Sequence, residues 1–139
     1  MRRVRVMVPL SIAVLVACLS LVAWAFLDNV RALTLDVIMT DGDGDGIDVT
    51  TNPVEITNRA CGVAVDCVEA YSTAEANYYR FSSRKRASDF AATLDDGFHV
   101  HYMVMDFAGK HDASKEHQLW AMEGLAGTWN DYEGTFPER

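Results

Sequence analysis

The sequence predicts an α+β domain behind one N-terminal transmembrane helix. Three observations support this class. Residues 6–27 form an almost unbroken apolar run, the remainder alternates between strand-like and helix-like apolar periodicity, and two cysteines lie close together in the polar part. The periodic segments follow in the order β-β-α-β-α, which is typical of helices packed on one face of a mostly antiparallel sheet.

The apolar run at residues 6–27 has the length of a membrane span. As a helix it measures about 30 Å, the thickness of the hydrocarbon core of a bilayer. Arg2, Arg3 and Arg5 precede it, and positive charge tends to stay on the cytoplasmic side. We therefore expect a cytoplasmic stub of residues 1–5, a single-pass signal anchor in the cell membrane, and an extracytoplasmic remainder.

Two other interpretations of the same run remain open. Ala23–Ala25 has the small-x-small form of a signal-peptide cleavage site, and Leu15–Cys18 resembles a bacterial lipobox whose Cys18 would be lipidated. A retained anchor is favoured because the apolar region of a signal peptide is about 7–15 residues long. The chain also stays apolar after Cys18, where a lipoprotein would continue with a polar tether. All three interpretations place residues 28–139 outside the cytoplasm.

The outward part of the chain is acidic. All 20 Asp and Glu residues but only nine of the 12 Lys and Arg residues follow residue 27, which leaves a net charge of −11 there. Such a surface argues against nucleic acid as a partner and is compatible with cations or a basic partner. Cys61 and Cys67 are the only cysteines after the apolar run. In an oxidising compartment this pair is expected to form a disulfide.

Residues 28–65 are expected to form an extended stalk. Apolar residues alternate over 33–39 as in a strand. The segment 41–48 then opens like a calcium-binding EF-hand loop, with carboxylates suited to bind calcium at Asp41, Asp43, Asp45 and Asp48. Asn52 stands where an EF-hand places its bidentate Glu. A flexible acidic linker is therefore the favoured interpretation and calcium the alternative. A short strand is expected at 54–57.

The folded domain is predicted at residues 66–129. Strand-like segments at 67–71 and 76–81 indicate a hairpin. An amphipathic helix follows, with Ser82 or Ser83 as its N-cap. Its first turn carries three basic residues, an unfavourable arrangement against the helix dipole: Arg84, Lys85 and Arg86.

The second half of this domain is predicted to contain one strand and one helix. Residues 98–107 are the strongest strand candidate, and the helix that follows is capped by Asp112 or Ser114. Residues 130–139 are expected to be a flexible tail. We expect six apolar side chains to be buried together: Phe90, Leu94, Val100, Val104, Leu119 and Met122.

The alternation within strand 98–107 separates two faces. One face is apolar and suits the core: Phe98, Val100, Tyr102 and Val104. The other mixes imidazole, thioether and phenyl groups: His99, His101, Met103, Met105 and Phe107. This mixture is typical of a protein-contact surface, and it is the predicted binding surface. The same His and Met side chains are also suited to copper.

Residues 79–104 resemble half of a SPOR domain. The resemblance rests on a strand, the Phe-Ser-Ser sequence at 81–83, a helix with spaced Ala and Leu, and the Gly-aromatic pair at 97–98. SPOR domains are bacterial extracytoplasmic modules, often behind one membrane helix, that bind septal peptidoglycan. The resemblance implies glycan binding by the sheet face. The second half of the chain shows no copy of this pattern, although the family carries two.

These patterns predict a non-enzymatic protein of the bacterial cell envelope. The sequence contains no Gly-x-Ser-x-Gly, His-Glu-x-x-His or phosphate-cradling glycine motif. We expect the outward domain to be a binding or accessory module for another envelope component, a protein or a glycan. The alternative is an extracytoplasmic metal-binding protein, with calcium at the acidic segment or copper at the His/Met face.

Overall fold

The computed structural model describes residues 14–16, 33–40, 50–129 and 132–138. The chain divides into two compact units, Met1–Leu33 and Thr34–Arg139. In the first unit residues 14–16 and Leu33 are described, and residues 14–16 are helical and exposed. The predicted membrane segment otherwise lies outside the described residues, as does the acidic segment 41–48. Within the described part of the chain, no helix is long and apolar enough to cross a membrane.

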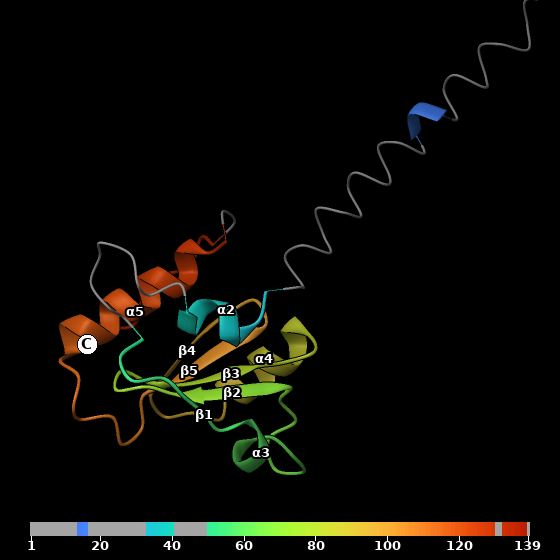
Figure 1. Cartoon of the computed structure of the whole chain (residues 1–139). Coiled ribbons are helices and arrows are strands. Elements are labelled where there is room, and N and C mark those ends of the chain that lie inside the picture. Colours follow the sequence, from blue (N-terminus) through green and yellow to red (C-terminus); the bar gives the residue numbers. More distant parts are fainter. Residues whose placement is uncertain (1–13, 17–32, 41–49, 130–131, 139) are drawn as a thin grey trace, which may run out of the picture. The chain divides into compact units, whose positions relative to one another are not determined.

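The second unit is an α+β fold with a five-stranded antiparallel sheet, as the sequence predicts at this level (Figure 1). The strand order is β1-β2-β3-β5-β4. The strands are β1 (Val54–Glu55), β2 (Glu69–Ser72), β3 (Asn77–Arg80), β4 (Gly97–Val100) and β5 (Met103–Asp106). The helices described in this unit are α2 (Leu35–Thr40), α3 (Thr57–Ala60), α4 (Arg84–Ala91) and α5 (Lys115–Gly127). The edges of the sheet are therefore β1 and β4.

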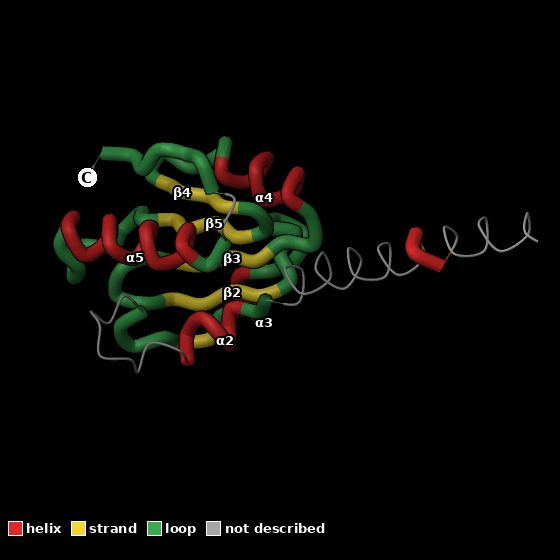
Figure 2. Tube along the Cα trace, turned by 90° about the horizontal axis from the view of Figure 1, so that it is seen from above, coloured by secondary structure: helices red, strands yellow, loops and turns green. Residues whose placement is uncertain are grey.

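Helices cover both faces of the sheet, so the prediction that they lie on one face is wrong. Helix α4 packs against one face of β4 and β5, while α2 and α5 lie on the other (Figure 2). The reason is visible in β5, where Met103, Val104 and Met105 are all buried. Successive strand residues point to opposite faces, so an apolar run of this kind needs a covering layer on each side.

The core under α4 is built around Phe81, Ala87 and Val104. Phe90 lies beside Phe81, with ring centroids 5.3 Å apart, and Leu94 completes this side. The predicted cap is confirmed, since the Ser83 side chain accepts a hydrogen bond from the Arg86 N–H. Phe90 and Leu94 are only partly buried.

The core on the opposite face lies under α5. This helix begins after Ser114, whose hydroxyl accepts from the His117 N–H, and it buries Met122 and Leu125. Val100 also lies on this face. The six residues expected to be buried together therefore divide between the two sides of the sheet. Leu119 of α5, which belongs to the same set of six, is half-buried.

Residues 35–40 form helix α2, where the sequence pattern favoured a strand or an extended stalk. Leu35 and Met39, one helical turn apart, are the buried positions. The Leu35 N–H donates to Glu69 Oε2 at 2.9 Å, and the Tyr71 hydroxyl donates to Asp36 Oδ1 at 3.2 Å. These bonds join α2 to β2, so this segment belongs to the folded unit.

The predicted disulfide between Cys61 and Cys67 is confirmed, with the two Cα atoms 5.0 Å apart. It closes a short loop after α3, in which the Gly62 N–H donates to the Val65 carbonyl. Val63 at the tip of this loop is fully exposed. The bridge therefore fixes a loop that has few apolar contacts of its own.

A buried carboxylate joins the segment before β1 to the β2–β3 connection. Glu75 is 0% exposed. Its Oε2 accepts from the Thr51 N–H at 3.0 Å and its Oε1 from the Thr51 hydroxyl at 2.5 Å. His117 Nε2 of α5 lies 4.0 Å from the same Oε1. Three segments far apart in the sequence thus meet at one acidic side chain.

The α4 core predicts the effect of one substitution. Phe81 is 2% exposed, so Phe81→Ala should lower the free energy of unfolding by about 3–5 kcal/mol, through lost burial and a residual cavity. Val63→Ala is the control and should change it by less than about 0.5 kcal/mol, because Val63 is fully exposed. Urea unfolding monitored by tryptophan fluorescence measures both. Equal effects of the two substitutions would contradict the packing described for Phe81.

Candidate functional site

The predicted strand 98–107 is in fact a hairpin. Strands β4 and β5 are joined by a two-residue turn at His101 and Tyr102, with Val100 paired to Met103. His101 has a φ of 53°, a conformation that residues with a side chain rarely adopt. Neither turn residue is one that favours such a turn, because tight hairpins prefer Asn-Gly, Asp-Gly or a leading Gly. The sequence of residues 98–107 therefore predicts one continuous strand rather than a hairpin.

This turn overturns the predicted binding surface. In one continuous strand Val100 and Met103 would face opposite sides, but as paired residues across the hairpin they face the same side. Met103, Met105 and Phe107 are accordingly buried. His101 lies in the turn and stacks on Trp129, with ring centroids 5.0 Å apart. Of the predicted surface, His99 alone is exposed.

The predicted metal sites are not assembled by the described residues. His99 faces the α4 side of the sheet, whereas Met103 and Met105 are buried on the α5 side. A copper site that combines these groups would need them on one face. Over the described ranges, no three His, Cys, Asp or Glu side chains cluster closely enough to hold a metal ion. Calcium binding at residues 41–48 stays a prediction, since these residues lie outside that part of the chain.

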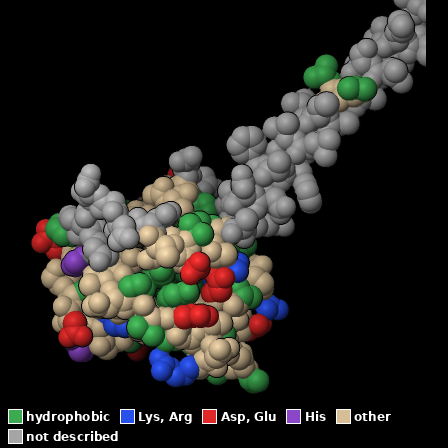
Figure 3. Space-filling view, in the orientation of Figure 1, with side chains coloured by type: hydrophobic (Ala, Val, Ile, Leu, Met, Phe, Trp, Pro, Cys, Tyr) green, Lys and Arg blue, Asp and Glu red, His purple; other side chains and the backbone are tan. Residues whose placement is uncertain are grey.

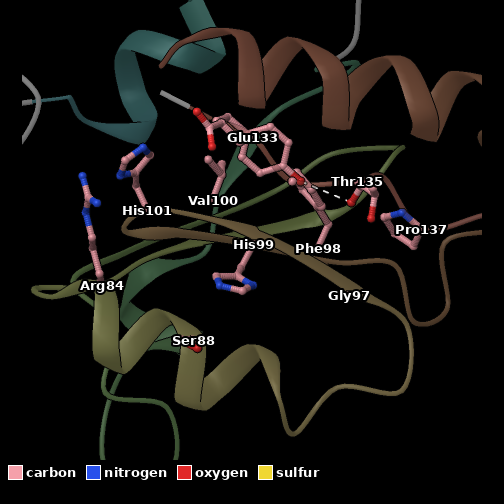
Figure 4. Close-up of a pocket in the computed structure, with 12 residues that line it drawn as sticks. Arg84, Ser88, Gly97, Phe98, His99, Val100, His101, Glu133, Thr135 and Pro137 are labelled. Carbon is pink, nitrogen blue, oxygen red and sulfur yellow. Dashed lines mark hydrogen bonds between the residues drawn. The ribbon is translucent and has the colours of Figure 1, made fainter. Parts of the chain in front are cut away.

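A groove of about 650 Å³ runs along β4 (Figure 4). Its floor is the strand itself, Gly97–Val100, together with His101. Arg84 and Ser88 of α4 form one wall, and residues 132–135 of the C-terminal segment, with Pro137, form the other. Figure 4 shows α4 and α5 on opposite sides of the strands, with His99 directed toward the α4 wall. The groove therefore lies where the edge of the sheet opens between its two covering layers.

The wall opposite α4 is aromatic. Tyr132 and Phe136 stack on Phe98, with ring centroids 5.7 Å and 5.6 Å from it. The Tyr132 hydroxyl donates to the Thr135 carbonyl at 3.3 Å, and burial raises the pKa of this hydroxyl above its ordinary value. Two residues of the expected flexible tail, Tyr132 and Phe136, thus pack against β4, while residues 130, 131 and 139 lie outside the described part.

The α4 wall is basic. The Arg84 guanidinium lies 5.8 Å from the centre of the Tyr102 ring at the hairpin turn. Lys85 and Arg86 follow it in the same helical turn, and they pair with Asp89 and Asp66 respectively. Elsewhere acidic side chains gather on the face shown in Figure 3. The first turn of α4 therefore places the Arg84 guanidinium beside the groove, in a part of the chain that is acidic overall.

The floor of the groove presents backbone hydrogen-bonding groups. The Phe107 N–H donates to the Asp96 carbonyl at 2.9 Å. Because hydrogen-bonded pairs alternate along an antiparallel ladder, Phe98 and Val100 also bond to β5. The N–H and C=O of Gly97 and His99 consequently point away from β5, into the open edge. No backbone bond to these outward groups is found among residues that the structure describes.

Gly97 sets the distance between the end of α4 and the edge strand. A Cβ at this position would lie 2.7 Å from Leu94 Cδ1, 3.0 Å from Leu94 Cβ and 3.2 Å from the Met105 carbonyl oxygen. All three approaches are closer than ordinary van der Waals contact. Glycine therefore lets β4 lie close to Leu94 in the turn that follows α4, and this packing shapes one end of the groove.

Comparisons with known proteins add no assignment: no family model, no curated protein and no solved structure matches the chain. The SPOR resemblance therefore rests on its short motif alone. Both faces of the central strands are covered by helices in the described unit. Glycan binding by the sheet face, which the resemblance implies, stays a prediction.

Sequence reasoning missed most of the groove. Among the lining residues it singled out only His99 and His101 as part of the binding surface, and it treated the tail that forms one wall as flexible. One signal was present, namely the basic first turn of α4, which opposes the helix dipole and begins at Arg84.

Substitution of Gly97 tests the packing that shapes the groove. Gly97→Ala should lower the free energy of unfolding by about 1–3 kcal/mol, because the added methyl group overpacks the contact with Leu94 and Met105. Gly62→Ala is the matched control, because nothing lies within 4 Å of a Cβ there. It should change stability by less than about 0.5 kcal/mol. Urea unfolding of the two variants decides, and a neutral Gly97→Ala would contradict the close approach.

Proposed function

We propose that this chain is a single-pass protein of the bacterial cell envelope whose outward domain is a non-catalytic binding module. The groove along β4 is its binding surface. The observation that carries this proposal is the edge strand itself, whose outward N–H and C=O groups lie at the floor of a walled groove. Exposed strand edges of this kind accept a further strand from a partner.

The location follows from the N-terminal sequence and the disulfide. Residues 6–27 are long and apolar enough for a membrane span, and the arginines before them favour a cytoplasmic N-terminus. The Cys61–Cys67 bridge is consistent with an oxidising compartment outside the cytoplasm. A module held at the membrane in this way meets other envelope proteins at high local concentration.

The chemistry of the groove favours binding over catalysis. Its polar side chains are a guanidinium, imidazoles, hydroxyls and one carboxylate, carried by Arg84, His99, His101, Ser88, Thr135, Tyr132 and Glu133. These groups donate and accept hydrogen bonds around an aromatic wall. Recognition sites commonly combine an apolar surface with a few placed polar groups in this way.

The topology is tested by protease accessibility. Protease added to intact spheroplasts that express the full chain should remove the domain, because residues 28–139 are proposed to lie outside. Immunoblotting of a C-terminal tag measures the loss, and permeabilised cells supply the positive control. A tag that is degraded only after permeabilisation would contradict the proposed orientation.

The binding surface is tested by photocrosslinking in the native envelope. A photoreactive residue in place of His99 should form a discrete adduct, because His99 is exposed in the groove. The same residue in place of Asn58, exposed on α3, is the matched control and should not form that adduct. Gel electrophoresis with mass spectrometry identifies the partner. No adduct at 99, or the same adduct at both positions, would contradict the groove as the binding surface.

A further inference from the structure

We infer that the occupant of the groove is an extended peptide segment of another protein, which adds to β4 as a further strand. Its apolar side chains face the aromatic wall, and the acidic or hydroxyl side chains between them face α4. This inference rests on the proposed binding function of the same groove and names the chemical class of the partner. It follows from the backbone, from the two walls and from the distribution of charge.

The backbone of β4 determines the conformation of the occupant. The outward N–H and C=O of His99, and those of Gly97, are two residues apart on one edge. A strand placed at the usual spacing of about 4.8 Å can bond to both positions. A helix satisfies its own backbone groups and would leave these groups of β4 unused. The floor therefore selects an extended chain.

The two walls determine the side-chain pattern. Successive side chains of an added strand point to opposite faces of the sheet. On one face they meet Tyr132, which lines the groove and stacks against Phe98 and Phe136. On the other they meet His99, Arg84 and Ser88. A segment that alternates apolar with polar residues therefore satisfies both walls, whereas a uniformly apolar segment leaves the α4 wall unmatched.

Charge determines the sign of the polar residues. Arg84 lies on the α4 wall and lines the groove, whereas the neighbouring Lys85 and Arg86 pair with Asp89 and Asp66. Among the described residues that line the groove, the carboxylate is that of Glu133, which belongs to the opposite wall. Acidic side chains of the bound peptide that face α4 thus lie near the Arg84 guanidinium and away from Glu133. Complementary charge of this kind selects partners and orients them.

A second copy of this chain fits the groove less well. Antiparallel pairing of two β4 strands requires a two-fold axis perpendicular to the sheet, which keeps equivalent faces on the same side. The α4 walls of both copies would then lie side by side, each carrying Arg84. Like charges at such an interface oppose association. A heterologous acidic segment meets no such conflict.

The experiment measures peptide binding to the full chain purified in mild detergent. The probe is a short fluorescent peptide of alternating valine and glutamate with blocked ends, and fluorescence anisotropy gives its Kd. One control peptide replaces glutamate by lysine, and another has the same composition with the glutamates grouped together. We expect the alternating acidic peptide to bind about tenfold or more tightly than either, which corresponds to the energy of one charge-assisted contact.

Variants separate the backbone contribution from the side-chain contribution. His99→Pro removes the outward N–H, which β5 does not use, and proline is tolerated at such an edge position. His99→Ala keeps that N–H and is the matched control. We expect His99→Pro to weaken binding about tenfold relative to His99→Ala. Arg84→Glu should reverse the preference between the glutamate and lysine peptides. Unchanged thermal unfolding midpoints show that each variant is folded.

Each contrary outcome overturns the inference. Equal binding of the lysine peptide refutes the acidic partner, and equal binding by His99→Pro and His99→Ala refutes strand addition. A dimer in analytical ultracentrifugation that His99→Pro dissociates would make a second copy the occupant. If no peptide binds while the crosslink at position 99 still forms, the proposed function stands and the peptide assignment fails. If neither peptide binding nor the crosslink at position 99 is seen, the proposed function and the peptide assignment both fail.

Discussion

The structure depends on the burial of β5 on both of its faces. Met103 and Met105 face one side and Val104 the other, and all three are at most 1% exposed. A strand of this kind requires a layer of apolar side chains above and below it. Helix α4 supplies one layer, and α5 with α2 supplies the other. In the described unit the faces of the central strands are consequently occupied by the protein's own helices, which leaves the edges of the sheet more open.

The two edges differ in what surrounds them. Strand β1 is only two residues long and has an exposed Val54, whereas β4 lies between a basic helical turn and an aromatic wall. That wall exists because the chain beyond α5 returns to place Tyr132 and Phe136 against Phe98. The groove therefore forms at β4, between α4 on one face of the sheet and the segment that follows α5 on the other.

The turn at His101 links packing to the site. A positive φ in a residue with a side chain is unfavourable unless the surroundings hold it. The His101 ring stacks on Trp129, which is itself buried at the end of α5. The same turn places Met103 on the face of Val100 and so decides which side chains of the hairpin are buried. The position of this turn therefore sets which hairpin side chains face α5 and places His99 on the opposite face.

Local signals in the sequence determined the α+β class, the hairpin of β2 and β3, the helix caps at Ser83 and Ser114, and the Cys61–Cys67 disulfide. Each of these depends on residues close together in the chain, through periodicity, a capping side chain or a short loop. Only the tertiary structure decided that 35–40 is a helix, that 97–106 is a hairpin, that helices cover both faces, and that the tail forms a wall. In each of these cases the deciding contact lies far away in the sequence, as between Leu35 and Glu69, His101 and Trp129, or Phe98 and Tyr132. Local propensity is too weak to compete with such contacts, so the groove could not be deduced from the sequence.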